Sequence, residues 1–118
     1  MTDRRKLADH YFVIPGTIRL SPSALAFARD FAAQFKGNTI VSFEYGFERT
    51  LRGPEGQVID LGDGFDLGLY RRSQVPREVV HRESGFEYAI QVPPWIFKAS
   101  NDRVIDVEGR EPPKLVLR

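Results

Sequence analysis

The hydrophobic pattern of this chain changes its period at Gly37, and that change limits the folds available to it. Residues 21–37 carry apolar side chains at three- and four-residue spacing, which predicts an amphipathic helix. Ser21 and Pro22 suit the first turn of that helix, and Gly37 suits its end. The apolar stripe is expected to anchor the core through three phenylalanines, Phe27, Phe31 and Phe35.

After the helix the pattern has a period of two. Residues 41–48 and 85–92 alternate apolar and polar side chains, which indicates strands with one buried face. Shorter strand candidates lie at 17–20, 57–61, 65–70, 103–107 and 114–118. We therefore predict the α+β class, with one main helix packed on a mostly antiparallel sheet or a small β-sandwich.

The length of 118 residues predicts a single domain, residues 1–118, in which residues 1–16 form an irregular N-terminal arm. A formal net charge of +1 argues against nonspecific binding to nucleic acid. The chain contains no apolar run of roughly 18 residues, so we expect no membrane span. No apolar signal-peptide run follows its basic start, and the expected location is the cytoplasm.

The chain has no cysteine, and this excludes several chemistries. Disulfides, cysteine nucleophiles and thiolate-held iron–sulfur clusters all need that residue, and we predict no cofactor. The histidines, His10 and His81, have no partner at metal-ligand spacing and no nucleophile motif beside them. Both are expected to lie on the surface, and no catalytic residue is assigned.

Three aspartates, Asp60, Asp63 and Asp66, are spaced three apart among glycines. They could converge on a weakly bound cation if the loop curled, but the spacing does not match a calcium-binding EF-hand loop. Within a strand, residues three apart point to opposite faces. Asp63 and Gly64 form a favoured turn pair, so we predict a hairpin turn there and no metal site.

Two stretches, residues 71–83 and 93–100, follow neither period. These stretches, together with Tyr70 directly before the first, contain side-chain types that are common at binding surfaces. The candidate binding residues are Tyr70, Arg71, Arg72, Arg77 and Trp95. In the alternative interpretation, the arginines pair with Glu78 and Glu83 in a solvated loop. Trp95 would then cover the edge of its own core.

Residues 18–35 (IRLSPSALAFARDFAAQF), 39–48 (TIVSFEYGFE) and 84–94 (SGFEYAIQVPP) carry a resemblance to a known family. In this order they resemble the A-type iron–sulfur carrier (HesB/IscA-like) domain, over roughly residues 17–95. That family has one cysteine in the loop near residues 46–47 and a Cys-Gly-Cys pair close to its C-terminus. Because this chain lacks cysteine, the resemblance implies a ligand-less relative to which no functional residue carries over.

Two functions follow from these observations. The first is a noncatalytic protein-interaction or accessory domain whose partner is another protein or a second copy of the chain. The alternative is a small-molecule-binding protein or an enzyme, whose arginine and carboxylate side chains converge in the fold. A pocket with convergent polar groups would favour the alternative, and an exposed apolar patch would favour the first.

Overall fold

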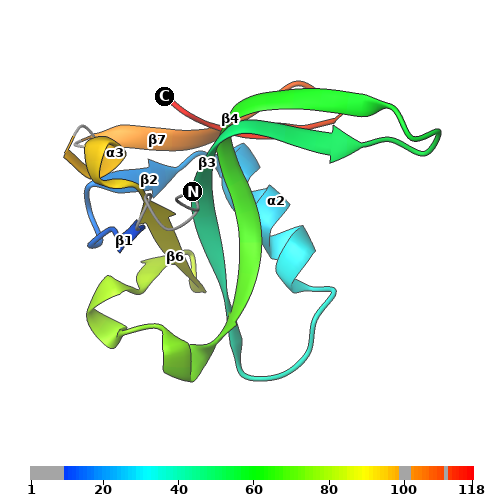
Figure 1. Ribbon diagram of the computed structural model, residues 1–118. Coiled ribbons are helices and arrows are strands. Elements are labelled where there is room, and N and C mark those ends of the chain that lie inside the picture. Colours follow the sequence, from blue (N-terminus) through cyan, green and yellow to red (C-terminus); the bar gives the residue numbers. More distant parts are fainter. Residues whose placement is uncertain (1–9, 99–101, 111) are drawn as a thin grey trace, which may run out of the picture.

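The computed structural model describes residues 10–98, 102–110 and 112–118, and most of its regular structure is β-strand (Figure 1). Eight strands form one sheet in the order β1-β6-β3-β4-β8-β7-β2, with β5 paired to β6. The strands are β1 (Tyr11–Phe12), β2 (Ile18–Leu20), β3 (Thr39–Arg52), β4 (Val58–Arg71), β5 (His81–Glu83), β6 (Phe86–Val92), β7 (Arg103–Glu108) and β8 (Lys114–Leu117). The helices are α2 (Pro22–Ala32) and α3 (Pro94–Lys98), and two 3₁₀ turns are η1 (Arg72–Gln74) and η2 (Arg77–Val79).

The predicted α+β class, with a helix packed on a mostly antiparallel sheet or small sandwich, is wrong. The protein is mostly β, and α2 is the only helix in the described residues longer than five residues. The sheet is mixed, because β3 runs parallel to β6 and β2 runs parallel to β7. Each of the predicted short strands lies at least partly within a strand of the sheet. An additional strand, β5, lies within a stretch that the sequence predicts to be irregular, and it pairs with β6. None of the described helices has the length and apolar character that crossing a membrane requires.

The β3–β4 hairpin contains the largest departure from the expected topology. The chain reverses at 53–57, where the Gly53 amide donates to the Gln57 carbonyl at 2.8 Å. The predicted turn at Asp63 and Gly64 is wrong, because both residues lie within β4. Residues 58–71 therefore form one strand of 14 residues instead of two short ones. The register shifts between Gly46 and Arg49, so the aspartates lie beside a bulge. The outer part of the hairpin, residues 47–62, projects from the body in Figure 1, and we call it the arm.

The helix α2 begins as predicted but buries other residues than expected. Ser21 caps it, since its hydroxyl accepts from the Ala24 amide at 3.1 Å. The fully buried positions are Ala24 and Ala28, whereas Phe35 lies beyond the helix and is 42% exposed. Phe27 is partly buried and packs against the core, and Phe31 is partly buried, so the three phenylalanines do not anchor the core together as expected. The small alanine side chains allow the helix backbone to approach β2 and β7 closely.

The buried side chains form two clusters on opposite sides of β6. Tyr88, Ile90 and Val92 of β6 belong to the main cluster, which holds α2 and both ends of the sheet together. The intervening Ala89 belongs to a smaller cluster, with Ile40, Val75 and Val79. This alternation along β6 follows the predicted period of two. The smaller cluster anchors the segment that contains η1 and η2.

The irregular N-terminal segment that the sequence predicts for residues 1–16 does not extend through residues 10–16. Tyr11 and Phe12 pair with the end of β6, and the amide of the buried Val13 donates to the Ile90 carbonyl at 2.9 Å. This segment therefore contributes to the core. Residues 1–9 lie outside the described residues.

Candidate functional site: an arginine cleft

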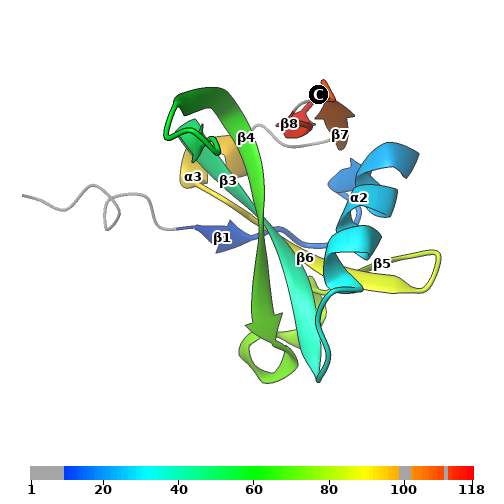
Figure 2. The same cartoon turned by 90° about the vertical axis from the view of Figure 1, so that its right-hand side faces the viewer.

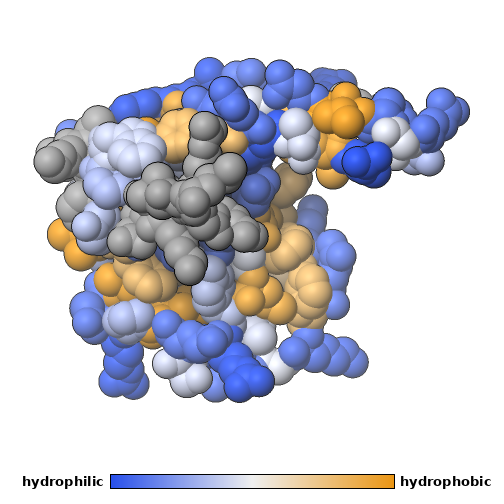
Figure 3. Space-filling model, viewed as in Figure 1, coloured by the Kyte–Doolittle hydropathy of each residue, from blue (hydrophilic) through white to orange (hydrophobic). Residues whose placement is uncertain are grey.

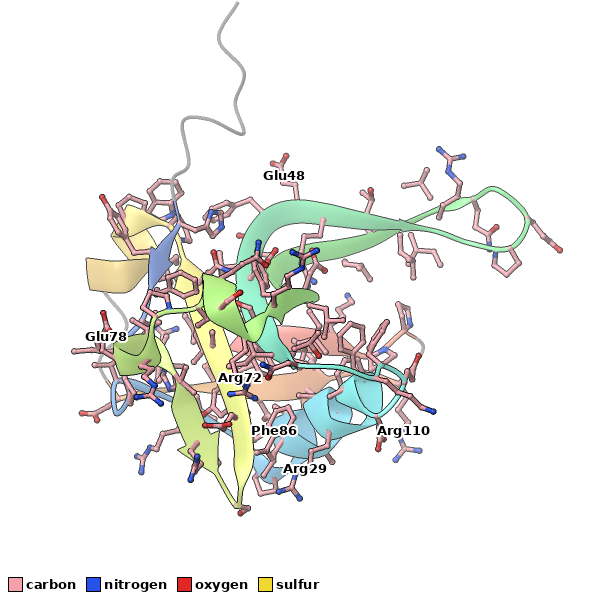
Figure 4. All side chains as sticks on the ribbon, turned by 90° about the horizontal axis from the view of Figure 1, so that it is seen from below. Arg29, Glu48, Arg72, Glu78, Phe86 and Arg110 are labelled. Atoms are coloured by element: carbon pink, nitrogen blue, oxygen red, sulfur yellow. The ribbon has the colours of Figure 1, made fainter. Side chains whose placement is uncertain are left out.

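A cleft of about 950 Å³ opens at the end of the body where η1 and η2 lie, and we call it the arginine cleft. It is lined by Asn38, Arg72, Ser73, Val75, Arg77, Val80, Arg82 and Glu87. Figure 4 shows Arg72 over β6, while Glu78 projects outward from η2, away from Arg72. Four separate segments thus contribute to one cleft: the residue before β3, the η1–η2 segment, β5 and β6.

The η1–η2 segment is held firmly, although its sequence has no regular period. Val75 and Val79 are 5% and 9% exposed and pack into the smaller cluster. The Arg72 amide donates to the Asn38 carbonyl at 3.0 Å, and the Val75 amide donates to the Arg72 carbonyl at 3.2 Å. These contacts fix the backbone that carries two of the three cleft arginines.

Glu87 organises two of those arginines. Its carboxylate accepts from Arg72 Nη1 at 2.8 Å and from Arg82 Nη2 at 2.9 Å. Arg72 Nε also donates to Asn38 Oδ1 at 3.1 Å. The hydrogen bond from Arg82 and the nearby charge of Arg72 lower the pKa of Glu87, so it stays ionised at neutral pH. Three guanidinium groups against one carboxylate leave the cleft lining with a net charge of +2.

Arg77 is the third arginine of the lining, and it differs from the other two. Its side chain makes no hydrogen bond or ion pair with any described residue. The residue is exposed on η2. A cation without a partner in the described part of the chain therefore stands beside two guanidinium groups that are already positioned, which suits recognition of an anionic group.

The structure brings two of the five sequence-predicted site residues, Arg72 and Arg77, into this cleft. Arg71 is exposed at the end of β4, outside the lining. The side chain of Tyr70 points toward β3, the strand paired with β4. Its hydroxyl donates to the carboxylate of Glu44 on β3. Partial burial and this hydrogen bond raise the pKa of Tyr70. Tyr70 packs beside the smaller cluster and so supports the sheet.

Trp95 lies at a different end of the molecule, on α3 (Figures 1 and 2). Its ring stacks on that of Phe47 with centroids 5.4 Å apart. Both side chains remain substantially exposed, at 50% for Trp95 and 43% for Phe47. The structure thus shows a polar cleft and, separately, an exposed aromatic pair.

Sequence reasoning missed the residue that organises the cleft. The alternative interpretation pairs the arginines with Glu78 and Glu83, but Arg72 and Arg82 pair with Glu87 instead. Arg82 and Glu87 face one another across the β5–β6 hairpin. The turn residues Ser84 and Gly85 both have positive φ, of 49° and 80°, as a tight two-residue hairpin requires. Recognising that turn in the sequence would have identified this cross-strand pair.

The two histidines bind backbone carbonyls. His81 is 3% exposed, so the expectation that it lies on the surface is wrong. Its Nε2 lies 2.8 Å from the Val13 carbonyl oxygen, and its ring stacks on Tyr88. Burial lowers the pKa of His81, which favours the neutral ring. His10 Nε2 lies 2.7 Å from the Tyr45 carbonyl oxygen.

Each of the three aspartates has its own partner within the β3–β4 hairpin. Asp60 Oδ1 accepts from the Gly62 amide at 2.9 Å, and Asp63 Oδ1 accepts from the Glu48 amide at 3.0 Å. Asp66 Oδ1 accepts from Arg49 Nη1 at 2.8 Å. Within the described residues, the structure contains no group of three acidic, histidine or cysteine side chains placed to hold a metal ion.

Comparison of the chain with protein-family models, with curated proteins and with solved structures found no match. The resemblance to the A-type iron–sulfur carriers therefore stays a prediction. The geometry of the arginine cleft carries the functional argument.

Proposed function

We propose that this protein is a noncatalytic binding domain, and that its arginine cleft receives an acidic segment of a partner protein. The observation that carries the proposal is the guanidinium group of Arg77, which has no partner among the described residues, beside the positioned pair of Arg72 and Arg82. A carboxylate that enters the cleft meets a net positive charge. It also meets donors whose positions are already set, which reduces the ordering cost of binding.

The shape and the lining of the cleft favour a peptide over a single ion. Its volume of about 950 Å³ is far larger than one carboxylate needs. Val75 and Val80 supply apolar surface among the polar groups, so a segment with mixed side chains has contacts to make. The cleft lies on a loop segment held by a packed cluster, an arrangement common at binding sites.

The proposal is tested with a fluorescein-labelled oligoglutamate peptide, whose binding is followed by fluorescence anisotropy. We expect Arg77→Glu to weaken binding by about tenfold or more, because it replaces an attractive charge with a repulsive one. The matched control is Arg52→Glu, the same charge change at an exposed position on the arm. Equal weakening by both variants would show only a response to net charge and would contradict the cleft.

The cleft also supports a second candidate function, the binding of a small anionic molecule. Its volume falls within the range usual for small-molecule pockets, and polar groups converge on it from several segments. Titration with inorganic phosphate separates the two functions. Saturable phosphate binding that displaces the peptide and disappears in Arg77→Glu would favour the small-molecule function.

A further inference from the structure

A second hollow, of about 240 Å³, adjoins the arginine cleft, and we call it the side pocket. Arg72 and Glu87 line both spaces, so their ion pair borders the side pocket as well as the cleft. Figure 4 shows Phe86, which also lines the side pocket, next to Arg72. The surface at this end of the molecule is mostly hydrophilic on the face that Figure 3 shows. A hollow with apolar residues in its walls therefore differs from its surroundings.

The side pocket lies where β3 and β6 separate. The two strands pair with one another from Val41 and Tyr88 onward. Thr39 at the start of β3 and Phe86 at the start of β6 come before these pairs, and both residues line the side pocket. The pocket therefore occupies the gap at the open end of the β3–β6 ladder.

The helix α2 forms a third side of the pocket. Ala32, the last residue of this helix, belongs to the lining. The guanidinium group of Arg29 donates to the Ser84 carbonyl in the β5–β6 turn, which ties α2 to that turn. Phe86 packs against the main cluster. The walls thus belong to elements that are already fixed to one another, so little ordering is needed when a side chain enters.

The accessible walls of the side pocket suit a flat aromatic ring. Leu69 is 36% exposed and Phe86 is partly exposed, and both offer apolar surface. The side chain of Arg72 is 40% exposed at the border with the cleft. A guanidinium group stacks favourably on the face of an aromatic ring, and two aromatic rings attract one another beyond the effect of the area that they bury. An aliphatic side chain gains neither contribution.

A chain that binds in the arginine cleft brings its neighbouring residues to the side pocket. A carboxylate that binds Arg72 from the cleft lies close to the pocket, because Arg72 borders both spaces. Each residue of an extended chain advances it by about 3.3 Å. A side chain one or two positions from the acidic residue therefore reaches the pocket.

We propose that the side pocket receives an aromatic side chain of the acidic segment, next to the acidic residue that the arginine cleft binds. This inference rests on the proposed function and specifies the sequence of the partner segment, an acidic residue with an aromatic residue beside it. The occupant belongs to that partner because the positive cleft attracts an acidic chain, and the pocket adjoins the cleft in which this chain lies.

The test uses three fluorescein-labelled peptides, each with three glutamates on either side of a central phenylalanine, leucine or alanine. The three peptides carry the same charge, so the arginine cleft attracts them equally. We expect the phenylalanine peptide to bind the wild-type chain about tenfold more tightly than the alanine peptide, as measured by fluorescence anisotropy. The leucine peptide should have an intermediate affinity.

A pair of variants locates the aromatic side chain. Ala32→Leu fills the side pocket at a position outside the lining of the arginine cleft. It should reduce the preference for the phenylalanine peptide and leave the affinity for the alanine peptide unchanged. The matched control is Ala33→Leu, the same substitution at an exposed neighbour that lines neither space, and it should keep the preference. If Ala32→Leu does not fold, the wild-type comparison of the peptides still decides.

The possible failures of this inference and of the proposed function differ. Equal affinity of the phenylalanine peptide and either of the other two would overturn this inference. If Arg77→Glu still weakened the binding of all three, the proposed function would stand. Binding of all three peptides that Arg77→Glu leaves unchanged would contradict the proposed function, and this inference with it. A preference that Ala32→Leu and Ala33→Leu reduce equally would place the aromatic side chain outside the side pocket.

Discussion

Glu87 gives the guanidinium groups of Arg72 and Arg82 one shared carboxylate acceptor, while both arginine side chains stay partly exposed, at 40% and 69%. Such pairs contribute little to stability when they are exposed. Their value in the arginine cleft is positional, because donors that are already oriented lose less freedom when a ligand binds. Arg72 and Arg82 together exceed the charge of Glu87 by one, and Arg77, with no partner in the described residues, adds a second positive charge.

The hydrogen bond of a single residue, Asp63, gives a prediction of stability. Its Oδ1 accepts from the amide of Glu48, a residue with a positive φ of 48° in the bulge. Asn retains an acceptor at this position and Ala does not. We expect Asp63→Asn to be mild and Asp63→Ala to lower the free energy of unfolding by about 1 kcal/mol, measured by denaturant unfolding. A calcium-dependent rise in melting temperature that Asp63→Asn abolishes would instead support a metal site.

His81 gives a prediction of pH dependence. Burial lowers its pKa in the folded state below the ordinary value of 6.5. His81 therefore binds a proton more readily in the unfolded chain than in the folded protein. The contribution of neutral His81 to the free energy of unfolding is complete above about pH 6.5, and it is lost as the pH falls toward the folded-state pKa. Chemical denaturation at neutral and mildly acidic pH should show this loss in the wild type. In His81→Gln the loss should be smaller, and an unchanged pH dependence would contradict the assignment.

At the scale of the element, α2 depends on its small residues. Ala28 is fully buried, whereas Ala26 is exposed on the same helix. We expect Ala28→Leu to destabilise the protein by about 1–3 kcal/mol through overpacking. Ala26→Leu should change stability by less than about 0.5 kcal/mol, since it touches no core residue. Equal effects on the unfolding midpoint would mean that α2 does not pack closely on the sheet.

The sequence predicted the helix start and most strands, because those signals are local. Ser21 and Pro22 mark the start of α2 by their own chemistry, and the alternation in residues 85–92 marks β6. Whether the chain turns at Asp63 and Gly64 or continues as a strand does not depend on local signals alone. Residues 53–57 and the pair Asp63–Gly64 both contain residue types that favour turns. In the structure β4 continues through Asp63 and Gly64, and its Phe65 pairs with β8.

The site was predictable only in part for a related reason. Arg71 and Arg72 are neighbours in sequence, yet β4 ends at the first and η1 begins at the second. Their side chains therefore take different directions, and only Arg72 lines the cleft. An aperiodic segment carries no pattern from which these directions could be read. Glu87 could be found only through its partner strand.

At the scale of the whole molecule, the protein carries two surfaces of different chemistry. The η1–η2 segment, which lines the arginine cleft, and α3, which carries Trp95, lie at different ends of the body (Figure 1). Trp95 stacks on Phe47. A binding measurement alone does not tell which of these surfaces an acidic peptide uses. Only a residue-resolved measurement does so.

The most direct test of the central claim is a ¹H–¹⁵N NMR titration of the wild-type chain with the oligoglutamate peptide. The account predicts saturable shifts of the Asn38, Arg77 and Glu87 amides, with the amides of Phe47 and Trp95 unchanged. Shifts that cluster around Phe47 and Trp95, or shifts that are equally large in Arg77→Glu, would contradict it.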